Sequence, residues 1–182
     1  GQKVLYLPQL PGEGRQMCRD TLTHGAQAHA ADPWDDRPSR EERFREDLSH
    51  RIPGIEFRDL LPILDQLRGC KSPQEIDLMR AAGTLTAEAV CGAMKSTRPG
   101  IGEWQLAALA DYIFRLNGAD GGAYRPIVAG GGNIWNAHYY RNDCPLISGD
   151  LVLMDYAPDL KYYTSDIGRM WPVSGTYNAW QR

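Results

Sequence analysis

The sequence contains no long apolar run, no strong excess of one charge and no close pair of cysteines. None of its apolar stretches approaches the roughly 20 residues that a membrane-spanning helix needs, and no signal-peptide pattern opens the chain. A formal net charge of −3 gives no basic field for nucleic acid. We therefore expect neither a membrane nor a nucleic acid among the partners of this protein.

The four cysteines are scattered along the chain. They lie at positions 18, 70, 91 and 144, without the paired spacing of zinc sites or redox motifs. A chain of 182 residues does not need disulfide bonds to fold, so we expect free thiols in place of a disulfide framework. Reduced thiols favour a cytoplasmic location.

The first part of the chain combines strand, loop and helix patterns. It begins inside a strand pattern, and its Gly, Pro and Asp content predicts loops at 12–15 and 31–38. The charged run between Ser39 and His50 predicts a short solvated helix. A strand and a short turn are expected over 55–64.

Two longer helix patterns follow. Ser72, Pro73 and Glu75 form a capping box with proline at the first helical position, and apolar residues then keep helical spacing as far as Arg98-Pro-Gly100. A second helix is expected from about Glu103 to Leu116, because Asn117-Gly118 gives a C-terminal cap. Both helices should pack on one side of a following sheet.

Two aspartates in the last part of the chain suggest a chemical function. Asp155 and Asp166 lie in two apolar, β-branched segments separated by a turn signal at 157–160, which predicts a β-hairpin. Symmetric pairing about Leu160 and Lys161 would place the two aspartates directly opposite each other, with roughly 5 Å between Cβ atoms. Facing carboxylates repel each other, and a divalent ion such as Mn²⁺, Mg²⁺ or Zn²⁺ would remove the repulsion.

The alternative is a solvated hairpin whose acids are neutralised by Lys161 or Arg169. Apolar neighbours on both strands favour buried acids, and buried acids need partners. The pattern therefore favours a metal site.

Two further features lie upstream of the hairpin. Gly130-Gly-Gly-Asn133 lacks the Lys-Ser or Lys-Thr of a phosphate-binding loop and does not open a helix pattern, so we expect a permissive turn and no nucleotide site. His138 is followed by two tyrosines. By itself, such a histidine is more typical of a hydrogen-bonded structural residue than of a catalytic one.

Several motifs occur in one order along the chain. They are Leu67-Arg-Gly-Cys-Lys-Ser-Pro-Gln-Glu-Ile76, Arg98-Pro-Gly100, Ile127-Val-Ala-Gly-Gly-Gly-Asn133, His138-Tyr139, Ser148-Gly-Asp-Leu-Val-Leu-Met-Asp155, Ser165-Asp-Ile-Gly-Arg169 and Trp171-Pro-Val-Ser-Gly175. Together they resemble the central stretch of aminopeptidase P and prolidase, the Xaa-Pro peptidases among the pita-bread metallopeptidases. The resemblance covers roughly the C-terminal two thirds of the chain. His-Tyr at 138–139, where methionine aminopeptidases carry His-Gly, favours the proline-directed branch.

The resemblance implies a role for each candidate site residue. Asp155 would be a bidentate ligand of one metal ion, and Asp166 would bridge the two divalent ions of a dinuclear centre. Manganese is the expected metal, with zinc or cobalt as alternatives. His138 would help to position the substrate and stabilise the tetrahedral intermediate, which reverses the structural interpretation given above.

The order of elements, two helices before several strands, predicts an α+β fold with the helices on one face of a mostly antiparallel sheet. The resemblance identifies residues 69–182 as the first half of a pita-bread domain. It identifies residues 1–68 as the C-terminal part of a smaller N-terminal domain with a linker.

The ligand set within the chain is incomplete by the family's pattern. The remaining ligands, one histidine and two glutamates, lie beyond the second aspartate in the family's order. His24, His29 and His50 precede the matching region, so none can replace the missing histidine. We therefore expect a piece of a longer polypeptide, truncated at both ends and inactive by itself.

The activity implied for the parent protein is metal-assisted hydrolysis of the bond between an N-terminal residue and a following proline. One alternative is a prolidase limited to dipeptides. Another is a non-catalytic pita-bread protein that binds peptides or proteins, which the presence of both Asp155 and Asp166 disfavours. The partners expected by resemblance are a peptide with proline in the second position and further copies of the chain in a homo-oligomer.

Overall fold

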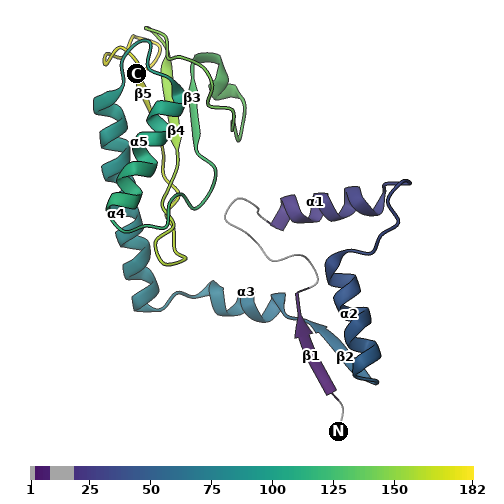
Figure 1. The fold of residues 1–182 in the computed structure, drawn as a ribbon. Helices are drawn as coiled ribbons and strands as arrows, with labels where there is room; N and C mark the ends of the chain where they lie inside the picture. The colour runs from purple at the N-terminus through teal and green to yellow at the C-terminus, as the bar shows by residue number, and fades with distance from the viewer. Residues whose placement is uncertain (1–2, 9–18) are drawn as a thin grey trace. The chain divides into compact units, whose positions relative to one another are not determined.

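The computed structural model describes residues 3–8 and 19–182, and the chain divides into two compact units, Gly1–Lys71 and Ser72–Arg182 (Figure 1). The loop predicted at 12–15 lies outside the described residues. Among the described residues, no helix combines the length and apolar character that spanning a membrane requires.

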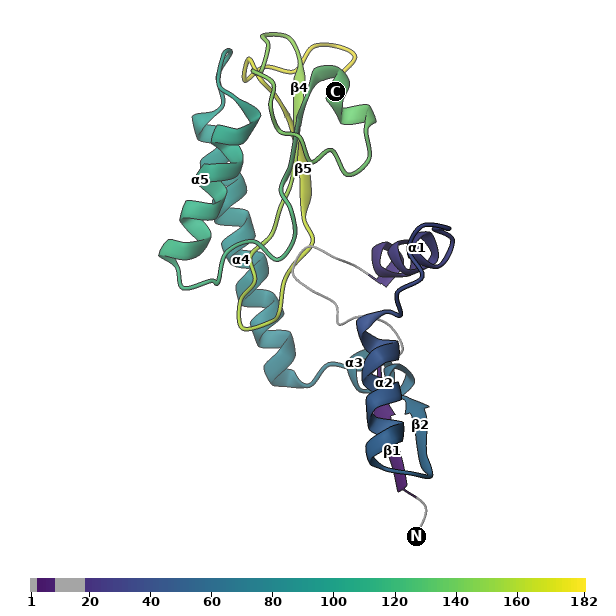
Figure 2. The same cartoon turned by 45° about the vertical axis from the view of Figure 1, so that its right-hand side comes forward.

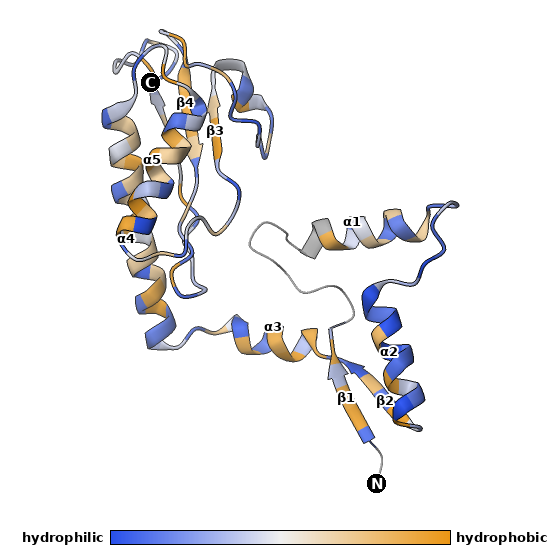
Figure 3. Ribbon diagram, viewed as in Figure 1, coloured by the Kyte–Doolittle hydropathy of each residue, from blue (hydrophilic) through white to orange (hydrophobic). Residues whose placement is uncertain are grey.

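In its described residues, the first unit contains a parallel strand pair and three helices. Its elements are β1 (Lys3–Leu7), α1 (Arg19–Ala30), α2 (Arg40–Arg51), β2 (Ile55–Asp59) and α3 (Leu61–Gly69). The charged helix predicted after Ser39 is confirmed as α2, which Ser39 caps by accepting a hydrogen bond from the backbone N–H of Glu42. This helix is mostly hydrophilic (Figure 3). Helix α1 was not predicted, because its sequence has few apolar residues at helical spacing.

The second unit contains two long helices followed by a sheet. Its elements are α4 (Pro73–Ser96), α5 (Glu103–Leu116), β3 (Ile127–Gly130), the 3₁₀ helix η1 (Gly131–Trp135), β4 (Leu151–Asp155) and β5 (Gly168–Pro172). Both helix predictions are confirmed at their ends. Ser72 caps α4 in a capping box with Glu75, and α5 ends at Leu116 with Asn117 as its C-cap. The glycine run that was expected to form a turn instead opens η1.

Helices α4 and α5 cover one face of the antiparallel sheet, whose strand order is β3-β4-β5 (Figures 1 and 2). The two helices approach closely because α4 presents small residues, and a Cβ added at Gly92 would lie 2.8 Å from Cδ1 of Ile113 on α5. The core between helices and sheet includes side chains with no exposed surface, among them Leu106, Phe114, Val152 and Met154. This arrangement confirms the predicted α+β layering, while β1 and β2 add a separate parallel pair.

The hairpin register differs from the prediction. Asp155 pairs with Gly168, not with Asp166. The chain reverses at Lys161 and Tyr162, which have φ angles of 53° and 69°, and Leu160 pairs with Tyr163 around this two-residue turn. Moving the centre of a hairpin by one residue shifts every partner by two residues, which accounts for the difference.

The segment that was expected to turn is extended instead. Residues 157–159 pair with residues 121–123 through hydrogen bonds between Ala123 N and Ala157 O and between Asp159 N and Gly121 O. Pro158 lies opposite Gly122 in this pairing. Partners far away in the sequence therefore override the local turn signal.

The difference in burial between two leucines of α5 predicts different effects of their substitution on stability. Leu106 has no exposed surface, whereas Leu116 is 68% exposed. Leu106→Ala should lower the free energy of unfolding by about 2–5 kcal/mol, because it leaves a cavity between helix and sheet. Leu116→Ala, the matched control, should change it by no more than about 0.5 kcal/mol. Urea unfolding measures both values, and equal losses would contradict this assignment of the core.

Candidate functional site

Asp155 is the last residue of β4 and is half-buried. The hydroxyl of Tyr124 donates a hydrogen bond of 2.6 Å to Oδ1 of Asp155. Burial raises the pKa of Tyr124 above its ordinary value, and the hydrogen bond to Asp155 and the charges of Asp155 and Asp166 raise it further. Tyr124 is therefore a neutral donor at pH 7, and both carboxylates lie close enough to its hydroxyl to act on it.

Asp166 is exposed and lies between the hairpin turn and β5. Its neighbour Ser165 makes a hydrogen bond of 2.7 Å between its Oγ and Oγ1 of Thr86 on α4. Thr86 donates its own proton to the carbonyl of Ala82, so Ser165 is the donor. The hydroxyl of Tyr163 also bonds the carboxylate of Glu75 at the start of α4. Two side-chain hydrogen bonds to α4 thus hold the segment that carries Asp166.

The two aspartates suit a divalent cation. Carboxylate oxygens are hard ligands, and within the described part of the chain neither aspartate forms an ion pair with Lys161 or Arg169. Arg169 instead donates to the carbonyl of Gly168. Tyr124 bonds Oδ1 of Asp155, and no hydrogen bond to Oδ2 is formed among the described residues. The chemistry of the donors therefore fits the predicted metal, and the assignment of Asp155 and Asp166 as ligands stays a prediction.

His138 lies in the loop that follows η1, with a φ angle of 54°. Its exposed ring stacks on Tyr140 with 5.8 Å between ring centroids, and both residues line a hollow of about 400 Å³. The guanidinium of Arg125 lies 5.0 Å from the centre of the Tyr140 ring. No hydrogen bond or ring contact joins His138 to either aspartate among the described residues. A series of contacts instead runs from His138 through Tyr140 to Arg125, the residue next to Tyr124.

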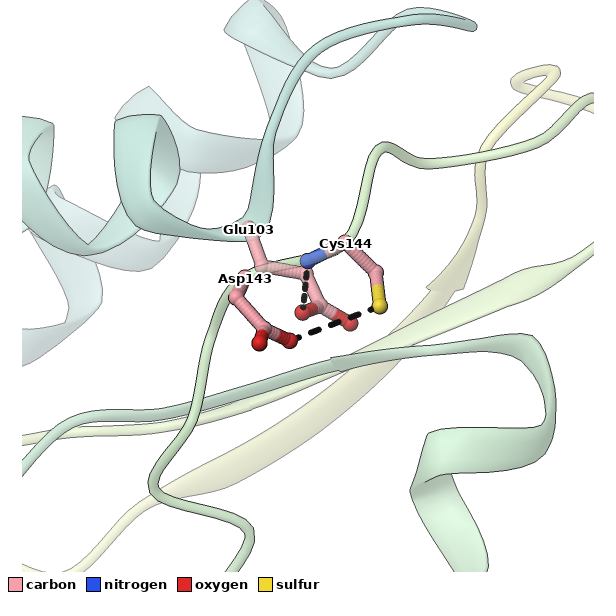
Figure 4. A group of neighbouring side chains, drawn as sticks. All are labelled: Glu103, Asp143 and Cys144. Carbon is pink, nitrogen blue, oxygen red and sulfur yellow. Dashed lines mark hydrogen bonds between the residues drawn. The ribbon is translucent and has the colours of Figure 1, made fainter.

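A second group of potential ligands lies at the base of the same loop. Within residues 3–8 and 19–182, Glu103, Asp143 and Cys144 are the group of three whose ligand atoms lie within 4.8 Å of one another (Figure 4). Asp143 is paired with Arg141, which holds the pKa of its carboxyl below the ordinary value. The group contains none of the predicted ligands.

Glu103 has no exposed surface and accepts four hydrogen bonds. The donors are the backbone N–H groups of Gly130 (2.8 Å) and Cys144 (3.0 Å), the side-chain amide of Asn133 (3.1 Å) and the hydroxyl of Tyr139 (3.0 Å). Its oxygens are thus fully used by protein donors, which leaves no room for a metal ion in this group. Sequence reasoning recognised Glu103 only as the start of a helix, because its partners are 27 to 41 residues away.

The sequence matches the model of metallopeptidase family M24 over residues 77–182. It is 38% identical to the Xaa-Pro aminopeptidase of Escherichia coli over 138 residues, which cover 76% of this chain and 31% of that protein. It is 41% identical to the Xaa-Pro aminopeptidase of Haemophilus influenzae over 127 residues, which cover 70% of this chain and 30% of that protein. The chain therefore spans about a third of the length of these relatives.

Solved structures agree with this match. Zinc-substituted E. coli aminopeptidase P in complex with product aligns with a TM-score of 0.72 and 32% identity, covering 99% of this chain and 37% of that one. A putative aminopeptidase P from Bacillus anthracis aligns with a TM-score of 0.77 and 26% identity, covering 98% and 38%. The fold is thus that of part of an aminopeptidase P structure. The chain belongs to metallopeptidase family M24, which confirms the resemblance seen in its motifs.

Tyr124 should affect metal binding through Asp155. Tyr124→Phe removes the hydroxyl that orients this carboxylate, and loss of such a partner should weaken Mn²⁺ binding by the whole protein about 10-fold. Tyr112→Phe removes the same group from an exposed position on α5 and should leave binding unchanged. Isothermal titration calorimetry measures both affinities. Equal Mn²⁺ affinity in the Tyr124→Phe and unaltered proteins would show that Asp155 does not depend on Tyr124.

Proposed function

We propose that the whole protein is a metal-dependent exopeptidase that hydrolyses the bond between an N-terminal residue and a following proline. The observation that carries the proposal is that Asp155 and Asp166 lie on one hairpin, at the end of β4 and just before β5, with the Tyr124 hydroxyl bonded to Asp155, in a chain of family M24. Several relatives named Xaa-Pro aminopeptidase, from bacteria and mammals, support the proline-directed substrate.

We propose that residues 69–182 form the first half of a pita-bread domain and that residues 1–68 belong to a smaller preceding domain. The division into compact units near residue 71 supports this assignment. So does the alignment of nearly the whole chain to about a third of aminopeptidase P structures. A cytoplasmic location and a homo-oligomer remain proposals. The free thiols of Cys70, Cys91 and Cys144 support the first.

Asp155 and Asp166 would hold divalent ions, with manganese as the expected metal and zinc or cobalt as alternatives. When bound, such ions supply Lewis-acid polarisation of a carbonyl and lower the pKa of water. The contribution of the chain itself is to place the two carboxylates on one hairpin, at the end of β4 and just before β5. Tyr124 supports this by donating a hydrogen bond to Asp155, which orients its carboxylate.

His138 would act on the substrate directly. Its ring nitrogens make no hydrogen bond to the described residues, and the ring faces a hollow wide enough for part of a peptide. An N–H of the imidazole can donate to the carbonyl oxygen of the scissile bond as negative charge develops there, or to the departing proline nitrogen. Stacking on Tyr140 fixes the plane of the ring and so the direction of this donor.

The metal assignment is tested by Asp166→Asn in the whole protein. An amide cannot replace a negatively charged ligand, so hydrolysis of an Xaa-Pro peptide with Mn²⁺ should be abolished and the bound manganese should fall. Asp77→Asn makes the same change at an exposed position on α4 and should leave both unchanged. Peptide hydrolysis and elemental analysis of the purified protein are the measurements, and full turnover in Asp166→Asn would refute the assignment.

The role of His138 is tested by His138→Ala. Loss of one transition-state donor should lower kcat by about 10²-fold or more, with the metal content preserved. His50→Ala, at the exposed end of α2, is the control and should keep the kcat of the unaltered protein. If His138→Ala also keeps that kcat, His138 is a structural residue.

A further inference from the structure

The segment of residues 131–144, here called the His138 loop, needs a specific set of contacts to keep one conformation. It contains two non-glycine residues with positive φ, His138 at 54° and Asn142 at 46°. Such backbone conformations persist only where surrounding contacts determine them. Most of its residues between Trp135 and Asn142 are exposed, so apolar burial contributes little to its order.

Glu103 supplies these contacts from outside the loop. It is the first residue of α5, and its carboxylate bonds one residue just before the loop and three within it. The two oxygens accept hydrogen bonds from different ends of the loop. Oε1 accepts from Gly130 and Asn133 at the start of the loop, and Oε2 accepts from Tyr139 and Cys144 near its end. A single carboxylate therefore brings together the two ends of the loop.

The surroundings of Glu103 satisfy the hydrogen-bonding capacity of its buried carboxylate. A buried carboxylate needs hydrogen-bond donors or a cation, and among the described residues Glu103 has no ion pair with Lys or Arg. Four hydrogen-bond donors surround the carboxylate instead, at the N-terminus of α5. The backbone of the loop base is fixed independently, because Glu103 N donates to Cys144 O at 3.0 Å.

Tyr139 connects the carboxylate of Glu103 to His138. Its ring is buried, and its hydroxyl accepts a hydrogen bond from Asn133 at 3.0 Å. The single proton of the hydroxyl is shared between Glu103 at 3.0 Å and Asp143 at 3.1 Å. Tyr139 is covalently next to His138. Burial, together with the hydrogen bonds to Cys144, Glu103 and Asp143, raises the pKa of Tyr139 above its ordinary value, so the hydroxyl keeps its proton. The Tyr139 ring is buried and Tyr140 is exposed. The backbone next to Tyr139 places the ring of His138 at the wall of the hollow.

We propose that Glu103 is a positioning residue for His138: its buried carboxylate fixes the two ends of the His138 loop and thereby the direction of the imidazole. This inference rests on the proposed function, because it concerns the residue assigned to act on the substrate. Among the described residues, Glu103 makes no hydrogen bond to Asp155, Asp166 or His138. Its effect on turnover passes through His138.

The first test uses hydrogen exchange of the whole protein. Glu103→Gln keeps the size of the side chain but turns an NH₂ group toward two of the four donors. The backbone N–H of Gly130 or that of Cys144 then loses its acceptor, depending on which oxygen the NH₂ group replaces. Exchange at one of these two ends of the loop should accelerate by at least about 10-fold while exchange in β4 stays unchanged. Glu88→Gln, an exposed position on α4, is the matched control. Unchanged exchange throughout residues 130–144 in Glu103→Gln would overturn the proposal.

The second test is a double-mutant cycle on hydrolysis of an Xaa-Pro peptide. Glu103→Gln should lower kcat by about 10-fold to 10²-fold with KM and metal content preserved, since misplacement of one group by about 1 Å has effects of this size. In the His138→Ala background the same change should cause no further loss. A loss of equal factor in both backgrounds would mean that Glu103 acts independently of His138, which would overturn the positioning role.

A second variant keeps the test decisive if Glu103→Gln does not fold. Tyr139→Phe removes the hydroxyl through which Tyr139, the neighbour of His138, bonds Glu103. Its effect on kcat should likewise disappear in the His138→Ala background. The proposed function and the role of Glu103 can be refuted separately. Absence of Xaa-Pro hydrolysis in the unaltered protein would refute the proposed function. The hydrogen-exchange measurement tests whether Glu103 orders the loop, and it does not require enzymatic activity.

Discussion

The packing of α4 and α5 against one face of the β3-β4-β5 sheet is the constraint on which the candidate site depends. Val152 and Met154 point into this core from β4 with no exposed surface. A slip of one residue in β4 would turn both toward the opposite face, so burial fixes the register of the strand. The register in turn fixes Asp155 at the end of β4, opposite Gly168.

Buried polar groups connect the irregular segments to this layered core. Thr86 joins α4 to the segment before β5, Glu103 joins α5 to the His138 loop, and Asn142 accepts from Val128 N and donates to Pro126 O beside β3. No buried side-chain polar atom of the described residues lacks a partner. Because an unpaired buried polar group is costly, each of these bonds selects one conformation for the loop that it holds.

The two ends of the candidate site are linked through the segment just before β3. Tyr124 contacts the acidic end by its hydrogen bond to Asp155. Its neighbour Arg125 contacts the histidine end by lying over the ring of Tyr140, on which His138 stacks. Consecutive residues thus contact the two groups of predicted site residues, one at each end. The backbone of one short segment connects these two contacts.

Local signals in the sequence determined helices α2, α4 and α5. The capping box at Ser72 and Glu75 and the cap at Asn117-Gly118 depend on residues within one helical turn, so they could be read directly. The order of motifs around His138, Asp155 and Asp166 identified the family. Only the tertiary structure decided the hairpin register and the roles of Tyr124, Thr86 and Glu103. The three side-chain roles depend on partners 27 to 79 residues away, and neither propensity nor periodicity carries information about such distant contacts.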